Sequence, residues 1–394
     1  MSDNNQSILH QPASVWVLTF ACTVSYMGIG LVDPILPTIA SAMNATPGQT
    51  ELLFTSYLFV TAFVMYFSAW ASHMLGTKKT LVYGVAIIVL FAALCSLSSS
   101  VGAIIGFRAG WGLGNALYVS TALAAIVAST AHPSHAILFY EAALGLGFAF
   151  GPLVGGLLGE VSWRGPFAGT AVLMGLALIA LAIFFKDTND AERIPIKPFD
   201  GIKGAFHRDM RWLGLGALFY NFAFMMMLTY APFPVKSAAS MAGKDFTPID
   251  LGLVFFGWGI ALAISSVFIA PRLSQSYGLR RVTLISIGLV VVFHALVALL
   301  QHNLVLEIIA VILSGAVLGT VNTLLTTVSM MGVTLPKPVA SSAYSGTRFI
   351  GSALAPTVVG PLSGLGEIAP MWAAAVSAAF AVLFLSISFK QKTA

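Results

Sequence analysis

Four charged residues lie inside long apolar segments of this chain, where a charge is expensive. They are Asp33, Arg108, Glu141 and Arg348. A charged side chain at the centre of a bilayer costs about 2.5–3.5 kcal/mol on insertion scales, so such residues are generally kept for pairing or for function. A carboxyl group in a medium of low dielectric favours its protonated form and can take up and release a proton near neutral pH. Asp33 and Glu141 are therefore candidate proton carriers.

Arg108 is the candidate partner of these acids, because a nearby cation favours the carboxylate form. A substrate cation arriving at Asp33 would act in the same direction and expel the proton, so that only one of the two occupies the acid at a time. Structural roles stay open for each residue. Asp33 can cap a helix or pair with Arg108, Glu141 can pair with Arg348 or a tyrosine, and Arg108 can bind the carbonyl groups of a helix end.

Polar-tipped and soft side chains within the apolar segments are candidates for the wall of a substrate cavity. Methionine adapts its shape to varied ligands, and rings with one or two acids suit a lipophilic, often cationic molecule. Plain packing or lipid exposure is the alternative for each. The candidates are Tyr26, Tyr140, Tyr220, Asn221, Met226, Tyr230, Asn322 and Arg348, with Met225 and Met227 beside Met226.

The composition indicates that membrane helices hold these residues. The 394 residues are 58% hydrophobic and 8% charged, and the mean hydropathy is +0.92, whereas soluble domains carry roughly 25% charged residues. The two cysteines, Cys22 and Cys95, provide neither a disulfide framework nor metal-ligand spacing. The sequence contains no phosphate-binding Gly-Lys loop. We therefore expect no enzyme activity, no cofactor and no nucleic-acid partner.

Twelve segments have the length of about 20 apolar residues that a spanning helix needs. They lie at 14–42, 50–73, 80–99, 103–130, 135–159, 165–186, 212–236, 249–271, 281–300, 304–333, 339–364 and 368–389. If both termini are cytoplasmic, fourteen Lys and Arg residues fall in cytoplasmic loops and tails, and three, Arg164, Lys236 and Lys244, fall outside. This bias predicts that orientation. The longest polar stretch, Lys186 to Arg211, predicts a cytoplasmic linker between two halves.

The two halves repeat each other in sequence. Gly76, Lys78 and Lys79 recur as Gly278, Arg280 and Arg281, 202 residues later. Tyr140, Gly147, Pro152 and Gly156 recur as Tyr344, Gly351, Pro356 and Gly360, 204 residues later. Parallel repeats of this kind place a substrate site between the halves, near the middle of the membrane.

Three segments together resemble the major facilitator superfamily, specifically its twelve-helix drug:proton antiporter branch. The run from Gly145 to Gly156, with Gly147, Gly151, Pro152 and Gly155, matches the antiporter motif of that branch. Arg108-Ala-Gly110-Trp111-Gly112-Leu-Gly114 is similar to its Arg-x-x-x-Gly-x-Gly pattern. The loop 69–79 keeps Gly76, Lys78 and Lys79 but has His73 and Met74 in place of the family's Asp-Arg. This loop therefore does not predict the usual charged latch between halves.

The resemblance implies an all-α membrane protein with twelve transmembrane helices in two pseudo-symmetric six-helix bundles. The bundles would cover residues 1–186 and 212–394, joined by the linker 187–211. It also implies a monomeric, proton-coupled exporter of lipophilic or cationic small molecules in the cell (inner) membrane. Uptake by symport and the translocation of lipids or metabolites on the same fold are the alternatives. We expect Gly151 and Pro152 to contact a helix of the other half, since small residues let backbones approach closely.

Asp33→Asn tests the proposed exchange of proton and cation directly. This side chain keeps its shape but cannot ionise, so we expect proton-driven export of cationic compounds to be abolished. Binding of neutral compounds should persist, because apolar contacts supply it, and Asp33→Glu should retain partial activity with an altered pH dependence. Transport of a cationic dye in membrane vesicles measures all three; uphill export by Asp33→Asn at the wild-type rate would contradict the assignment.

Overall fold

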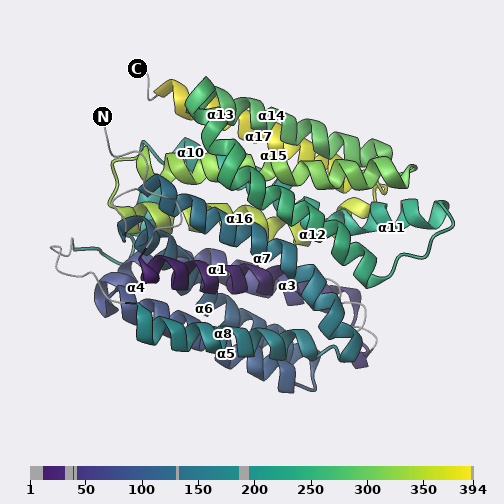
Figure 1. Ribbon diagram of the computed structural model, residues 1–394, viewed down its shortest axis with the longest axis horizontal. Coiled ribbons are helices and arrows are strands. Elements are labelled where there is room, and N and C mark those ends of the chain that lie inside the picture. Colours follow the sequence, from purple (N-terminus) through teal and green to yellow (C-terminus); the bar gives the residue numbers. More distant parts are fainter. Residues whose placement is uncertain (1–11, 32–38, 40–41, 130–132, 186–194, 392–394) are drawn as a thin grey trace.

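The computed structural model describes residues 12–31, 39, 42–129, 133–185 and 195–391, and every regular element within them is a helix (Figure 1). The first half contains α1 (Ala13–Gly30), α3 (Pro47–Met65), α4 (Ser68–Leu75), α5 (Thr77–Leu97), α6 (Val101–Ala128), α7 (Pro133–Val161) and α8 (Gly165–Phe184). The short α9 (Asp200–Ala205) follows. The second half contains α10 (Arg211–Tyr230), α11 (Pro232–Met241), α12 (Pro248–Ile264), the π-helix η2 (Ser265–Ile269), α13 (Ala270–Tyr277), α14 (Leu279–Leu300), α15 (Leu304–Met331), α16 (Lys337–Ser363) and α17 (Ala369–Gln391).

Ten helical stretches in the described ranges are long and apolar enough to cross a membrane, or eleven if α3 and α4 form one bent span. The sequence predicted twelve spanning helices, one more than these eleven. The missing one is α16, which has 27 residues but is not apolar enough to be counted. Its serines, threonines and Arg348 lower its hydropathy. Arg348 and most of these serines and threonines are buried among the other helices, so α16 is polar where it faces protein.

Helix starts and turns repeat between the halves, and the turns are those of the sequence repeat. Thr46 and Thr247 each form a reciprocal capping box at the start of α3 and α12, which satisfies two backbone N–H groups that have no partner within the helix. Gly76 and Gly278 have φ values of 89° and 84° between α4 and α5 and between α13 and α14. Only glycine adopts such a conformation without steric cost, so these glycines form the same turn in both halves.

Each half also has one irregular helix at the corresponding place. The chain bends by 60° between α3 and α4, and the π-helix η2 interrupts the helix that continues from α12 into α13. Tyr66 at the bend and Phe268 within η2 are 202 residues apart, the same offset as in the sequence repeat. Neither irregularity was predicted from hydropathy, which placed single helices at 50–73 and 249–271.

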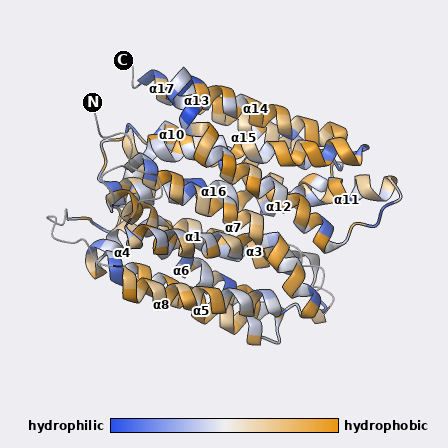
Figure 2. Ribbon diagram, in the orientation of Figure 1, coloured by the Kyte–Doolittle hydropathy of each residue, from blue (hydrophilic) through white to orange (hydrophobic). Residues whose placement is uncertain are grey.

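A belt of exposed apolar side chains surrounds the molecule. The outward faces of α5, α8, α14 and α17 are largely orange in the hydropathy view (Figure 2). Patches of this size on a water-soluble surface would be unusual, and they suit contact with acyl chains. The exposed residues include Leu90, Val172, Leu176, Ile179, Ile183, Leu289, Val292, Val376, Phe380 and Leu383.

Small residues on α7 form two stripes that face two different helices. A Cβ atom added to Gly147, Gly151 or Gly155 would lie within 3.0 Å of α1 or of Leu31, which follows it. The second stripe contains Gly145 and Ala149 and packs against α12 of the other half, where Gly259 lies opposite Ala149. The expectation for Gly151 was therefore wrong, because it packs within its own half.

Pro152 lies between the two stripes. Its ring contacts Gly30 of α1, while its carbonyl oxygen is 3.4 Å from a Cβ atom built on Gly252 of α12. The expected contact with the other half is thus present at Pro152. The helix α7 runs from Pro133 to Val161 without interruption at this proline.

Gly351→Ala should destabilise the protein through overpacking. A Cβ atom at Gly351 would lie 2.0 Å from the carbonyl oxygen of Leu218 on α10, and forced backbone shifts of this kind cost about 1–3 kcal/mol. Both cysteines are buried, so a thiol-reactive fluorescent dye reports thermal unfolding in detergent. Gly288→Ala is the matched control, because no atom lies within 4 Å of its added Cβ. Equal unfolding midpoints for the two variants would contradict the expectation.

Candidate functional site

A buried polar network joins both halves at the centre of the molecule. The hydroxyl groups of Tyr26 on α1 and Tyr140 on α7 form a short hydrogen bond with each other. Arg348 on α16 donates from Nη2 to the Tyr26 hydroxyl over 3.3 Å. All three side chains are at most 2% exposed. The network therefore brings together three residues that the sequence placed in the candidate cavity wall.

Glu141 lies in the same region, one residue after Tyr140 on α7. It is fully buried, and its Oε1 accepts a hydrogen bond of 2.6 Å from Thr326 Oγ1 on α15. The bond connects the first half of the chain to the second. Its Oε2 has no hydrogen-bond partner among the described residues. Glu141 and Arg348 interact electrostatically without an ion pair between them, so the pairing that the sequence allowed is indirect.

Arg348 is only partly satisfied by this network. Its Nε and Nη1 have no hydrogen-bond partner among the described residues. The guanidinium carbon lies 5.5 Å from the ring centre of Tyr344 and 5.7 Å from that of Phe349, within the range of cation–π attraction. The rings thus stabilise the charge from two sides, and N–H donors are left over.

A small cavity of about 10 Å³, room for about one water molecule, lies beside Arg348. Its lining comes from both halves of the chain and is mostly apolar and aromatic, as is usual for sites that bind small organic molecules. The lining residues are Tyr26, Ile29, Leu144 and Phe148 from the first half, and Asn221, Phe224, Met225, Asn322, Arg348, Phe349 and Ser352 from the second.

Hydrogen bonds between α10 and α16 set the position of Arg348. The Asn221 amide donates to the Arg348 carbonyl oxygen over 3.2 Å and also to the Ser352 hydroxyl. Gly351 lets the two backbones approach closely at this point. Asn221 therefore acts as part of the cavity wall and as the fixed support of the helix that carries the arginine.

The remaining candidates for the cavity wall lie elsewhere. Tyr220 donates to the Leu318 carbonyl oxygen at 2.7 Å, within the second half. Tyr230 donates to the Glu367 carbonyl oxygen at 2.6 Å, next to the α16–α17 loop. Met226 is fully buried, and its neighbour Met225 contributes to the lining instead. Each has a packing role in this structure, the alternative that the sequence left open.

Arg108 is held in an aromatic surrounding inside the first half. Its Nε donates to the Leu53 carbonyl oxygen on α3 over 3.0 Å, and its charge lies 4.7 Å from the ring centre of Tyr57 and 5.1 Å from that of Trp111. These residues do not belong to the network around Arg348. Its predicted partner, Asp33, lies outside the described residues, so the structure does not test that pairing.

Hydroxyl groups join the halves at the end of the bundle where α1 begins and α17 ends. Ser342 donates to the Met65 carbonyl oxygen at 2.6 Å, and Ser341 donates to that of Ser120 at 2.7 Å. The Tyr66 hydroxyl lies 2.9 Å from Thr347 Oγ1. The bend after α3 exposes the Met65 carbonyl oxygen for this purpose, because the helix hydrogen bonds stop there. We call these contacts the hydroxyl latch.

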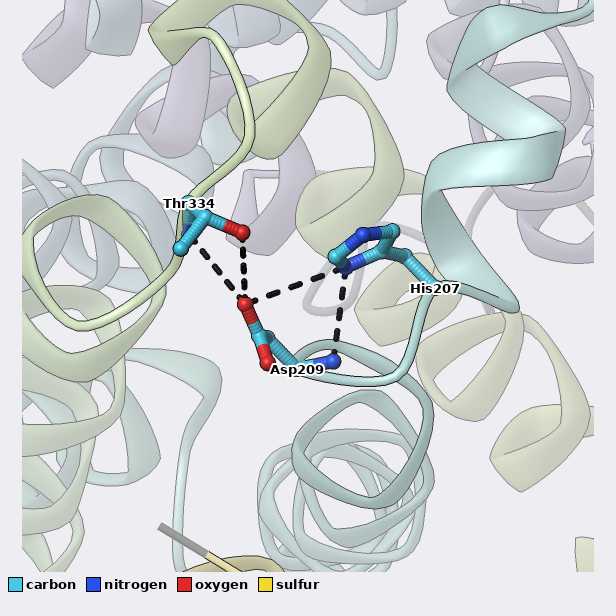
Figure 3. Close-up of polar contacts among 3 residues, drawn as sticks. All are labelled: His207, Asp209 and Thr334. Atoms are coloured by element: carbon cyan, nitrogen blue, oxygen red, sulfur yellow. Dashed lines mark hydrogen bonds and ion pairs between the residues drawn. The ribbon is translucent and has the colours of Figure 1, made fainter.

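The lysines of the loop 69–79 do not take part in the hydroxyl latch. Lys78 Nζ donates to the Ala182 carbonyl oxygen of α8 in its own half over 2.9 Å, and Lys79 is exposed. At the same end, Figure 3 shows Asp209, just before α10, between His207 and Thr334. The Thr334 hydroxyl donates to Asp209 Oδ2 at 2.7 Å, so the described part of the linker is fixed to the α15–α16 loop.

Sequence reasoning missed one buried acid. Glu307 lies in the first turn of α15, is fully buried, and its carboxylate oxygen atoms have no hydrogen-bond partner among the described residues. Hydropathy could not reveal this burial, which depends on how other helices pack around α15. The buried His294 has both ring nitrogen atoms bonded to carbonyl oxygen atoms, of Val290 and Ala223, and is a structural residue.

Comparisons with known proteins agree on one family. The model of the Major Facilitator Superfamily matches residues 18–243. Multidrug efflux protein YfmO of Bacillus subtilis (strain 168) is 46% identical over 364 residues, covering 90% of this chain and 88% of that protein. The class G tetracycline resistance protein of Vibrio anguillarum is 26% identical, over 66% of this chain and 67% of its own length. The crystal structure of the human organic anion transporter MFSD10 (TETRAN) superposes with a TM-score of 0.78 at 17% identity, covering 95% of this chain and 99% of that one, which shows the shared fold.

Thr326→Val should destabilise the centre of the protein. Among the described residues it leaves both oxygen atoms of the buried Glu141 without a hydrogen bond, and an unsatisfied buried group costs about 1–3 kcal/mol. Thr327→Val is the control, since that hydroxyl bonds the Thr323 carbonyl oxygen of its own helix. Thermal unfolding of both variants, each alone and combined with Glu141→Met, which has no oxygen to accept the bond, measures the coupling. If Thr326→Val costs the same stability with Met as with Glu at position 141, the bond contributes nothing specific.

Proposed function

Because the chain belongs to the major facilitator superfamily, we propose that it exports lipophilic small molecules across a membrane in exchange for protons, with no further cofactor. The efflux activity follows from its relatives, which are named for multidrug efflux and tetracycline resistance. The long apolar helices place the chain in a membrane as a multi-pass protein. A transporter of this kind makes and breaks no covalent bond in its substrate, and it is not an enzyme.

One observation carries the proposal: the cavity is lined from both halves, and Glu141 bonds across them beside it. A secondary transporter needs a binding site between two bodies that rock against each other, and an ionisable group that senses their relative position. Protonation removes the negative charge of Glu141 and changes its hydrogen bonding to Thr326 of the other half. The protonation state of Glu141 therefore affects the contact with Thr326 of the other half, next to the proposed substrate site.

The proposed architecture has twelve transmembrane helices in two six-helix bundles, residues 1–186 and 212–394, with the linker 187–211 between them. The repeated caps, turns and irregular helices support it. Packing supports it as well, because α1 against α7 and α3 against α6 correspond to α10 against α16 and α12 against α15. With α16 and the bent α3–α4 pair added, the ten apolar stretches become twelve.

The proposed location is the cell (inner) membrane, with both termini and the linker in the cytoplasm and the protein as a monomer. The excess of Lys and Arg in the loops at that end supports this orientation. The hydroxyl latch then lies on the cytoplasmic side. Opening toward the cytoplasm requires Ser341, Ser342 and Tyr66 to leave their partners, so these bonds favour the state in which that side is closed.

Uptake and lipid or metabolite translocation are the alternative functions on this fold. The efflux relatives and the glycine run in α7 favour export. Asp33 and Arg108 stay candidates for proton coupling. A preference for cations would come from Asp33, which lies outside the described residues, and this preference stays a prediction.

Glu141→Gln should uncouple proton movement from the substrate. Everted vesicles acidified by respiration contain protons that leave when an exchanged substrate is added, and a pH-sensitive dye such as ACMA records their exit. We expect the neutral dye Nile red to trigger proton exit with wild-type protein and not with Glu141→Gln, since glutamine cannot ionise. Glu160→Gln, at the exposed end of the same helix, should behave as wild type.

Two results would count against this proposal. Proton exit with Glu141→Gln at the wild-type rate would exclude Glu141 as the coupling acid. If cells that produce the wild-type protein retain as much Nile red as cells without it, and Nile red triggers no proton exit, the protein is not a proton-coupled exporter of lipophilic molecules.

A further inference from the structure

The charged residue in the lining of the cavity is an arginine. Among the described residues, Arg348 is the only charged side chain in the cavity lining. No described carboxylate lies within 4.0 Å of its guanidinium nitrogen atoms. A buried cation without a neighbouring anion is strongly unfavourable, and proteins generally balance it with a partner. A ligand that enters the cavity can provide that partner.

We propose that the cavity selects amphipathic organic anions, with Arg348 as the residue that binds the acidic group. The inference rests on the proposed export function and adds the substrate class. Nε and Nη1 of Arg348 are unpartnered donors in a site that is 2% exposed. The planar guanidinium matches a carboxylate more closely than any other side chain does, and bonds between charged partners are about twice as strong as neutral ones.

The other residues of the cavity lining indicate the chemistry of the ligand beyond its acidic group. Phe148, Phe224 and Phe349 present rings to the cavity, and Ile29 and Leu144 add aliphatic surface, so the ligand body is apolar and preferably aromatic. Asn322 Oδ1 also lacks a hydrogen-bond partner among the described residues. It accepts a hydrogen bond, and therefore favours a ligand that carries a hydroxyl or amide N–H group in addition to its acid.

The carboxylate of Glu141 and an anionic ligand both balance the positive charge of Arg348. The carboxylate of Glu141 interacts with Arg348 electrostatically while its hydrogen bond goes to Thr326. Protonation of Glu141 removes a negative charge near Arg348, so Arg348 attracts an anionic ligand more strongly. Binding of the anion and binding of a proton at Glu141 therefore strengthen each other. For an anionic substrate, the exchanged proton must therefore reside on a different acid, whereas Glu141 keeps the coupling role proposed above for neutral substrates such as Nile red. Asp33 is the other acid that the sequence places deep in a span.

Two dyes with the same xanthene scaffold test the charge preference. Fluorescein is an anion near neutral pH and carries a carboxylate, whereas rhodamine 123 is a cation whose acid is esterified. Fluorescence anisotropy with the purified full-length protein in detergent gives both affinities. We expect wild-type protein to bind fluorescein more tightly than rhodamine 123. The reverse order would overturn the proposal without any variant.

Variants assign the preference to Arg348. Arg348→Gln should weaken fluorescein binding about tenfold or more, as loss of a charged hydrogen bond does, and should not weaken rhodamine 123 binding. Arg348→Lys should restore part of the affinity, and Glu141→Gln should strengthen fluorescein binding. Arg272→Gln, an exposed arginine on α13, is the control and should change neither affinity. Equal losses for the two dyes in Arg348→Gln would show a packing role only and overturn the proposal.

Failure of this inference is distinguishable from failure of the proposed function. If Nile red drives proton exit but fluorescein binding does not depend on Arg348, the exporter assignment holds and the anion preference is wrong. If fluorescein binding depends on Arg348 but no dye is exported, the site is correct and the function is wrong.

Discussion

The burial of Arg348 is the constraint on which the centre of this protein depends. A guanidinium group away from water needs negative potential from its surroundings, and the surrounding helices provide it in small contributions. The Tyr26 hydroxyl accepts one of its hydrogen bonds, the faces of two rings lie within 6 Å, and Glu141 acts from a longer distance. Because Tyr26 and Glu141 belong to the other half of the chain, the charge draws the two halves together at the cavity.

This electrostatic attraction works only because the helices on either side pack without gaps. Gly147 and Gly351, which correspond in the sequence repeat, let α7 approach α1 and α16 approach α10 within each half. Those close contacts set the distances from Tyr140 to Tyr26 and from Asn221 to Arg348. The second stripe of α7, at Gly145 and Ala149, faces α12 instead. The helix α7 thus makes a fixed contact with α1 in its own half and a second contact with α12 of the other half. Relative movement of the halves has to occur at the second contact.

Hydropathy, spacing and the repeat predicted the helices and their order. Four of the predicted wall residues, Tyr26, Asn221, Asn322 and Arg348, line the cavity, and their role in binding a substrate stays a prediction. These patterns could not distinguish neighbours on one helix, because a step of one residue turns a side chain by about 100°. Met225 lines the cavity while Met226 does not, and Asn221 does while Tyr220 does not. The bend after Met65 and the π-helix η2 were equally out of reach, since neither break contains a glycine or proline. Burial of Glu307 depends on the packing of other helices around α15, which no local pattern encodes.

The hydroxyl latch shows how the second half can be held at one end without charges. A charged latch draws on strong pairs that lose much of their strength in water and salt. The bonds from Ser341 and Ser342 to backbone carbonyl oxygen atoms are neutral, buried and individually worth about 1 kcal/mol. A closed state held by a few such bonds can be opened by events at the cavity, because each bond is individually weak.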